Sequence, residues 1–94
     1  MKVKTTRWDA AEHLETDEDM AAYLEAALEA GDAELVSAAL GDIARAKGLS
    51  EISRQTGLGR AGLNRALSPE GKPEFATVMK IVNALGLKLH ASAT

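Results

Sequence analysis

The sequence predicts a single all-α domain over residues 1–94, built from five to six short helices with a short C-terminal β-strand. Apolar residues recur at spacings of three and four along most of the chain, which is the period of helices with one buried face. Glycine or proline follows these runs, where a helix must end. Residues 49–67 also have the spacing of two short helices joined by a tight turn.

Three helices are predicted within residues 1–48. Each starts at a side chain that can cap its first turn: Asp9, then Thr16 or Asp17, and then Asp32. In the second and third helices the apolar residues form one stripe, and a glycine follows the last turn. The expected ranges are residues 9–14, 17–30 and 32–47, with stripes of Met20, Tyr23, Leu24, Ala27 and Leu28 in the second helix and of Leu35, Val36, Ala39, Leu40, Ile43 and Ala44 in the third.

A helix-turn-helix is predicted over residues 49–67. We expect Ser50 to cap the first helix, and Ile52 and Leu63 to pack the two helices together. Gly57 ends the first helix, because glycine takes a positive φ at no steric cost. The second helix then follows, with Leu58 in the corner, Gly59 at the N-cap and Arg60 at the start.

The second helix of this pair presents a face suited to reading DNA bases. Its outward residues are Arg60, Ala61, Asn64 and Arg65. Arginine can bond guanine bidentately, asparagine can do the same to adenine, and alanine can touch a thymine methyl. Two glycines, Gly59 and Gly62, leave the surface slim enough for close approach to a major groove. Three further side chains, Ser50, Arg54 and Lys72, are suited to phosphate contacts.

The C-terminal part is predicted to contain a last helix over residues 74–86 and a strand over residues 87–91, after a loop with two prolines. The helix should bury Phe75, Val78, Met79, Val82 and Leu85, and the tail alternates apolar and polar residues. A lone strand needs a partner for its backbone groups. Either residues 1–5 or the strand of a second copy pairs with it, which favours a homodimer; the alternative is a frayed C-terminus.

Charge is divided unevenly along the chain. Residues 8–34 contain ten carboxylates and no lysine or arginine, whereas residues 49–94 contain six basic and three acidic residues, a balance of +3. The second region should attract DNA phosphate, and the first should repel it. The acidic region is interpreted either as solvated helix faces or as a docking surface for a basic protein, with Glu12, Glu25 and Glu29 as candidate contacts.

No catalytic, metal or cofactor site is predicted. The triplet Gly57, Gly59 and Gly62 matches the dinucleotide-binding glycine spacing, but no strand precedes it and no βαβ unit fits the chain. His13 and His90 lack a partner at metal-ligand spacing. The chain has no cysteine, and no apolar run approaches the roughly 20 residues that span a bilayer. We therefore expect a cytoplasmic, non-enzymatic protein without a membrane partner.

The chain resembles the addiction-module antidotes, the HigA-like antitoxins with an Xre or lambda-repressor type helix-turn-helix. The resemblance rests on residues 8–14, 23–29 and 41–48 together with the helix-turn-helix. It implies a homodimer that represses its own operon by binding double-stranded DNA and neutralises a small basic toxin similar to RelE and ParE. Two positions depart from the wider family, Ser53 and Gly59. Ser53 fits if its hydroxyl bonds to a backbone carbonyl, whereas Gly59 caps weakly and lacks a phosphate-contacting hydroxyl.

Two other functions are compatible with the same residues. One is a free-standing transcriptional regulator that has no toxin partner. The other is an interaction module whose helix-turn-helix no longer reads DNA. A short basic reading frame beside the gene would favour the antitoxin over the regulator, and binding of DNA at low salt would exclude the interaction module.

Overall fold

The computed structural model describes residues 10–68 and 70–93, and all regular secondary structure in these ranges is helical. No helix in the described part of the chain is long and apolar enough to cross a membrane. The elements are a 3₁₀ turn η1 (Ala10–His13) and the helices α1 (Asp17–Ala30), α2 (Ala33–Lys47), α3 (Leu49–Thr56), α4 (Arg60–Leu67) and α5 (Phe75–Ala84).

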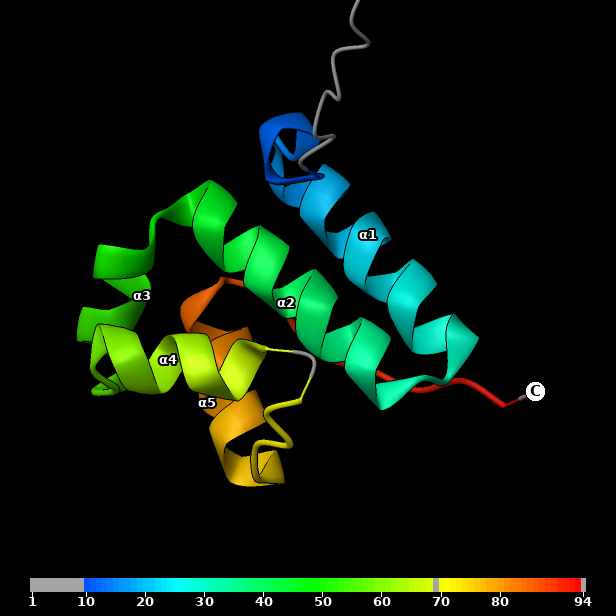
Figure 1. Ribbon diagram of the computed structural model, residues 1–94. Helices are drawn as coiled ribbons and strands as arrows, with labels where there is room; N and C mark the ends of the chain where they lie inside the picture. Colours follow the sequence, from blue (N-terminus) through cyan, green and yellow to red (C-terminus); the bar gives the residue numbers. More distant parts are fainter. Residues whose placement is uncertain (1–9, 69, 94) are drawn as a thin grey trace, which may run out of the picture.

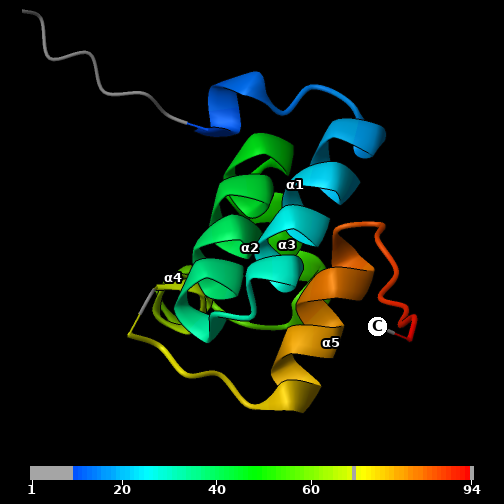
Figure 2. The ribbon, with the colours of Figure 1, turned by 90° about the vertical axis from the view of Figure 1, so that its right-hand side faces the viewer.

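Helix α2 is the centre of the fold. It runs antiparallel to α1 and also contacts η1, α3 and α4, while α5 packs against α3 (Figures 1 and 2). Ile43 and Ala44 of α2 have no exposed surface, because they meet side chains from both sides of the molecule. The same core contains Ile52 of α3, Leu63 of α4, and Ile81, Val82 and Leu85 at the end of the chain's last helix.

The predicted helix ends agree with the structure for α1 and α2. Thr16, rather than Asp17, caps α1: its hydroxyl accepts the Asp19 N–H at 3.0 Å, and the Asp19 carboxylate accepts the Thr16 N–H at 3.2 Å. Asp32 caps α2 by accepting the Glu34 N–H at 2.9 Å. Gly31 between them has φ 72°, a conformation that favours glycine. Side chains next to each helix therefore define where it begins.

The predicted strand over residues 87–91 is wrong. The Leu87 N–H donates to the Val82 carbonyl at 3.2 Å, and residues 88–93 form no backbone hydrogen bonds with the described part of the chain. The alternation has a different cause, since Leu87 and Leu89 are half-buried against the core while Lys88 and His90 point to solvent. Residues 1–5, proposed as the pairing strand, lie outside the described residues.

The prediction that Phe75 is buried is also wrong, because 73% of it is exposed. Phe75 is the first residue of α5, and the buried residues of this region, Ile81, Val82 and Leu85, lie about two turns later. Leu28 and Leu35, members of the predicted stripes, are 43% and 47% exposed. Periodicity indicates which face of a helix is apolar, but it does not indicate where that face extends beyond its packing partner.

Candidate functional site

The turn between α3 and α4 is held by side-chain and backbone hydrogen bonds. Gly57 has φ 78°, and its N–H donates to the Ser53 carbonyl at 3.1 Å. The Ser53 hydroxyl donates to the Leu58 carbonyl at 2.5 Å. This is the backbone hydrogen bond predicted for a serine at this position. The Thr56 hydroxyl donates to the Ile52 carbonyl at 2.8 Å and accepts the Leu58 N–H at 3.3 Å. Sequence reasoning missed Thr56, although a threonine directly before a turn glycine is a recognisable signal.

The outward face of α4 contains the four predicted base-reading residues. Leu63 and Leu67 are buried, whereas Arg60, Ala61, Asn64 and Arg65 are exposed. The fold itself does not require the glycines on this side: no atom lies within 4 Å of the position that a Cβ would take at Gly59 or Gly62. Gly59 is the N-cap of α4, as predicted, and it makes no side-chain cap. The exposed face of α4 therefore carries the polar side chains Arg60, Asn64 and Arg65, and the glycines add no side-chain bulk beside them.

One of the predicted phosphate-contacting residues, Ser50, lies beside Arg60. The Arg60 guanidinium is 3.5 Å from the Ser50 hydroxyl, at the outer limit of a hydrogen bond. The predicted capping role of Ser50 is wrong, because α3 begins at Leu49 and its N-cap is Gly48, two residues before Ser50, with φ 111°. Arg54 forms an ion pair with Glu51 on the exposed face of α3.

Glu51 limits the positive charge of this surface. Its carboxylate accepts hydrogen bonds from Arg54 and, at 2.6 Å, from the Gln55 amide. These hydrogen bonds, the one from Arg54 foremost, lower the pKa of Glu51 below its ordinary value of 4.5. Glu51 therefore stays ionised near neutral pH and partly neutralises Arg54, so the two residues form an exposed pair that phosphate would have to compete with.

Lys72 does not lie with the other predicted DNA contacts. It follows the C-terminal end of α4, whereas Arg60 begins that helix (Figure 1). Gly71 lies so close to α4 that a Cβ there would be 2.2 Å from the Arg65 carbonyl oxygen, and Lys72 then takes φ 52°. The Lys72 side chain lines a hollow between α2 and α5. The structure therefore separates Lys72 from Arg60 and from Ser50, which lies beside Arg60.

The three candidate toxin contacts also divide into two places. Glu12 is exposed in η1, beside the start of α1, while Glu25 and Glu29 are exposed near the end of α1 (Figure 1). Glu25 and Glu29 line a shallow hollow between α1 and the chain after α5. The structure brings Glu25 and Glu29 together and leaves Glu12 at the opposite end of the helix.

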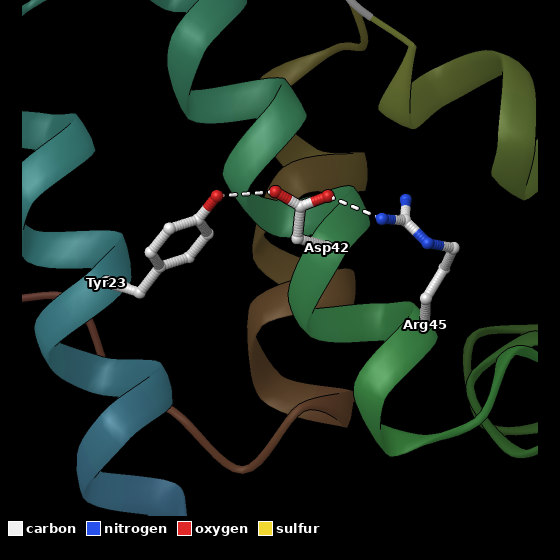
Figure 3. Close-up of polar contacts among 3 residues, drawn as sticks. All are labelled: Tyr23, Asp42 and Arg45. Carbon is white, nitrogen blue, oxygen red and sulfur yellow. Dashed lines mark hydrogen bonds and ion pairs between the residues drawn. The ribbon is translucent and has the colours of Figure 1, made fainter. Parts of the chain in front are cut away.

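A polar contact joins α1 to α2 beside the core. The Tyr23 hydroxyl donates to the Asp42 carboxylate at 2.5 Å, and Arg45 pairs with the other carboxylate oxygen at 2.7 Å (Figure 3). Sequence reasoning assigned Tyr23 to the core, but it is half-buried with its hydroxyl directed at α2. No described group of three histidine, aspartate or glutamate side chains is arranged to hold a metal ion. We therefore interpret this contact as structural.

Comparison with known proteins identifies the family. A family model described as "probable addiction module antidote protein" matches residues 4–93. A protein of Haemophilus influenzae, described as uncharacterized, is 49% identical over 83 residues, which cover 88% of this chain and 86% of that protein. No solved structure matches the chain. Because the family model covers almost the whole sequence, the chain belongs to the family of probable addiction module antidote proteins.

Proposed function

We propose that the protein is a DNA-binding antitoxin that neutralises a toxin similar to RelE and ParE and represses its own operon. Membership of the antidote family supports the toxin-antitoxin role and implies a toxin partner. The observation that carries the DNA-binding part is the outward face of α4, where Arg60, Ala61, Asn64 and Arg65 are exposed together on one short helix.

In this proposal α3 and α4 form an Xre or lambda-repressor type helix-turn-helix, and α4 enters the major groove. Arg60 and Asn64 supply bidentate contacts to guanine and adenine, and Ala61 meets a thymine methyl. Ser50 and Arg54 contact phosphate, with Arg54 exchanging its Glu51 partner for DNA. The absence of atoms around the Cβ positions of Gly59 and Gly62 leaves room for a close approach.

The remaining parts of the proposal concern assembly and location. In this proposal the protein acts as a cytoplasmic homodimer. Two copies of α4 then read two half-sites about one DNA turn apart. It acts by binding two macromolecules and catalyses no reaction. The acidic residues at the end of α1, including Glu25 and Glu29, suit a basic toxin electrostatically.

Binding to the promoter upstream of the protein's own gene tests the DNA-binding part. We expect wild-type protein to bind this duplex in a gel-shift assay, with an affinity that falls steeply as salt rises. Arg60→Ala or Asn64→Ala should weaken binding by about 1–3 kcal/mol for each lost base-pair contact. Lys88→Ala is the control: it removes an exposed charge that follows α5 and is not part of α4, and this variant should bind DNA as wild type does.

Two outcomes would contradict this part of the proposal. Wild-type protein that does not bind the duplex at low salt would leave only an interaction role. Binding that resists salt would contradict docking on phosphates. The toxin part is tested by co-expression with the protein encoded next to this gene: copurification and relief of growth arrest are expected, whereas DNA binding without either would indicate a free-standing regulator.

A further inference from the structure

An apolar groove lies at the end of the molecule where α1 turns into α2. It is a hollow of about 640 Å³ between the end of α1, the start of α2 and the face of α5. In Figure 2 the turn between α1 and α2 and the start of α5 lie toward the same end of the fold. Its apolar lining, which defines the apolar groove, includes Leu24, Leu28, Val36, Leu40, Phe75 and Val78.

Two exposed side chains make this groove unusual for a surface hollow. Phe75 is 73% exposed and Leu28 is 43% exposed, although both line it. Exposed apolar patches of this kind mark interaction sites, and aromatic side chains often anchor the centre of an interface. The buried core includes Ile81, Val82 and Leu85 of this region, whereas Phe75 and Leu28 are not part of it. The groove is therefore suited to receiving apolar side chains from outside.

The charge around the groove is predominantly negative. Asp32 and Glu34 line it, and Glu25 and Glu29 line the adjoining hollow, which shares Leu24, Leu28 and Leu89 with the groove. Two lysines, Lys72 and Lys88, lie on the same linings. The two hollows together therefore contain four carboxylates and two lysines. A partner with positive charges beside its apolar residues would complement this rim.

We propose that the apolar groove receives a segment of the toxin partner that carries apolar side chains flanked by lysine or arginine. The inference rests on the proposed antitoxin function and adds the place and chemistry of docking. A second copy is a poorer occupant, because a two-fold axis through the groove would bring the acidic rim against itself. None of the outward α4 residues lines the groove, so toxin and DNA can be bound at once.

The experiment measures binding of the protein encoded beside this gene to the full chain by isothermal titration calorimetry. Phe75→Ser and Leu28→Ser should each weaken binding at least tenfold, because each removes an apolar anchor. Leu35→Ser is the matched control, since Leu35 is 47% exposed in the first turn of α2 but does not line the groove; the affinity of this variant should stay within twofold of wild type. Promoter binding by all three variants should be unchanged, which shows that they fold.

A second pair of variants tests the charge. Glu34→Lys, on the groove lining, should weaken binding of the same partner at least fivefold, whereas Glu18→Lys, in the first turn of α1 and outside both linings, should leave it unchanged. Equal binding by wild type and the Phe75 and Leu28 variants would overturn the inference while leaving the antitoxin function intact. Wild-type protein that does not bind this partner would overturn both. A Phe75→Ser variant whose sedimentation changes from dimer to monomer would overturn the inference by assigning the groove to a second copy.

Discussion

The α1–α2 hairpin and the α3–α4 pair share one core but are held together differently. α1 and α2 are 14 and 15 residues long and pack along their apolar stripes, whereas α3 and α4 have eight residues each. The shorter pair depends on its turn, where Ser53, Thr56 and Gly57 make local hydrogen bonds, and on Ile52 and Leu63 reaching the core. Because helices of eight residues are unstable alone, the long hairpin supplies the platform on which the short pair stays folded.

Ile43→Ala should give the largest effect, because Ile43 is fully buried in the helix that contacts both regions. We expect a loss of about 2–5 kcal/mol in the free energy of unfolding. Urea titration followed by circular dichroism measures it, and amide NMR signals of α1 and α4 should disappear together. Leu35→Ala, at an exposed position of the same helix, should change stability by no more than about 0.5 kcal/mol. Melting of α4 well before α1 would show that the pair is not coupled to the hairpin.

Tyr23→Phe removes the hydroxyl that donates to Asp42 and so weakens the contact between α1 and α2. A hydrogen bond to a charged group contributes about 1.5–3 kcal/mol, and we expect a loss near the lower end because Asp42 keeps its Arg45 partner. Thermal and urea unfolding measure the loss. A double-mutant cycle with Asp42→Asn should show coupling, whereas promoter affinity should not change. Additive effects of the two substitutions would contradict the contact.

Gly62→Ala separates stability from DNA binding in α4. Alanine should stabilise the helix by about 0.5–1 kcal/mol, because the site has open space and alanine has the higher helix propensity. If close approach to DNA depends on a slim helix, promoter affinity should fall in the same variant. Ala22→Gly, at an exposed position of α1, is the control for a stability change of similar size away from α4, and its promoter affinity should equal that of wild type. An affinity equal to wild type would show that Gly62 does not lie against DNA.

Glu51→Gln should have the smallest effect on stability. The pKa of Glu51 is lowered in the folded protein, so its ion pair with Arg54 stabilises the fold above the unfolded-state pKa of about 4.5 and is lost as the pH falls through the lower folded value. The melting temperature of wild type should slightly exceed that of the variant at pH 7, and the difference should shrink as the pH falls below 4.5. Promoter binding should become tighter in the variant, because Arg54 is released for phosphate. A weaker affinity would show that Glu51 positions Arg54 for DNA.

Much of the α3–α4 region could be predicted from the sequence because its determinants are local. The turn glycine at position 57, the N-cap at Gly59 and the four exposed residues of α4 all follow from helical periodicity and capping within a few residues. Ser50 and Arg54 were harder to interpret, because one depends on where α3 begins and the other on whether Glu51 engages its guanidinium. Each of these depends on a side chain or backbone position that spacing alone does not define.

The sequence by itself determined helices α1 to α5, the cap of α2 and the division of charge along the chain, whereas the helix predicted over residues 9–14 is the 3₁₀ turn η1. These follow from side-chain chemistry that acts within a turn or two of helix, such as Asp32 capping α2. Only the tertiary structure decided that Phe75 stays exposed, that residues 87–91 pack without forming a strand, and that Leu28 and Phe75 line the same groove. Those outcomes depend on which distant segments of the chain pack around α2. Hydrophobic periodicity describes only one helix at a time, so it cannot predict these tertiary contacts.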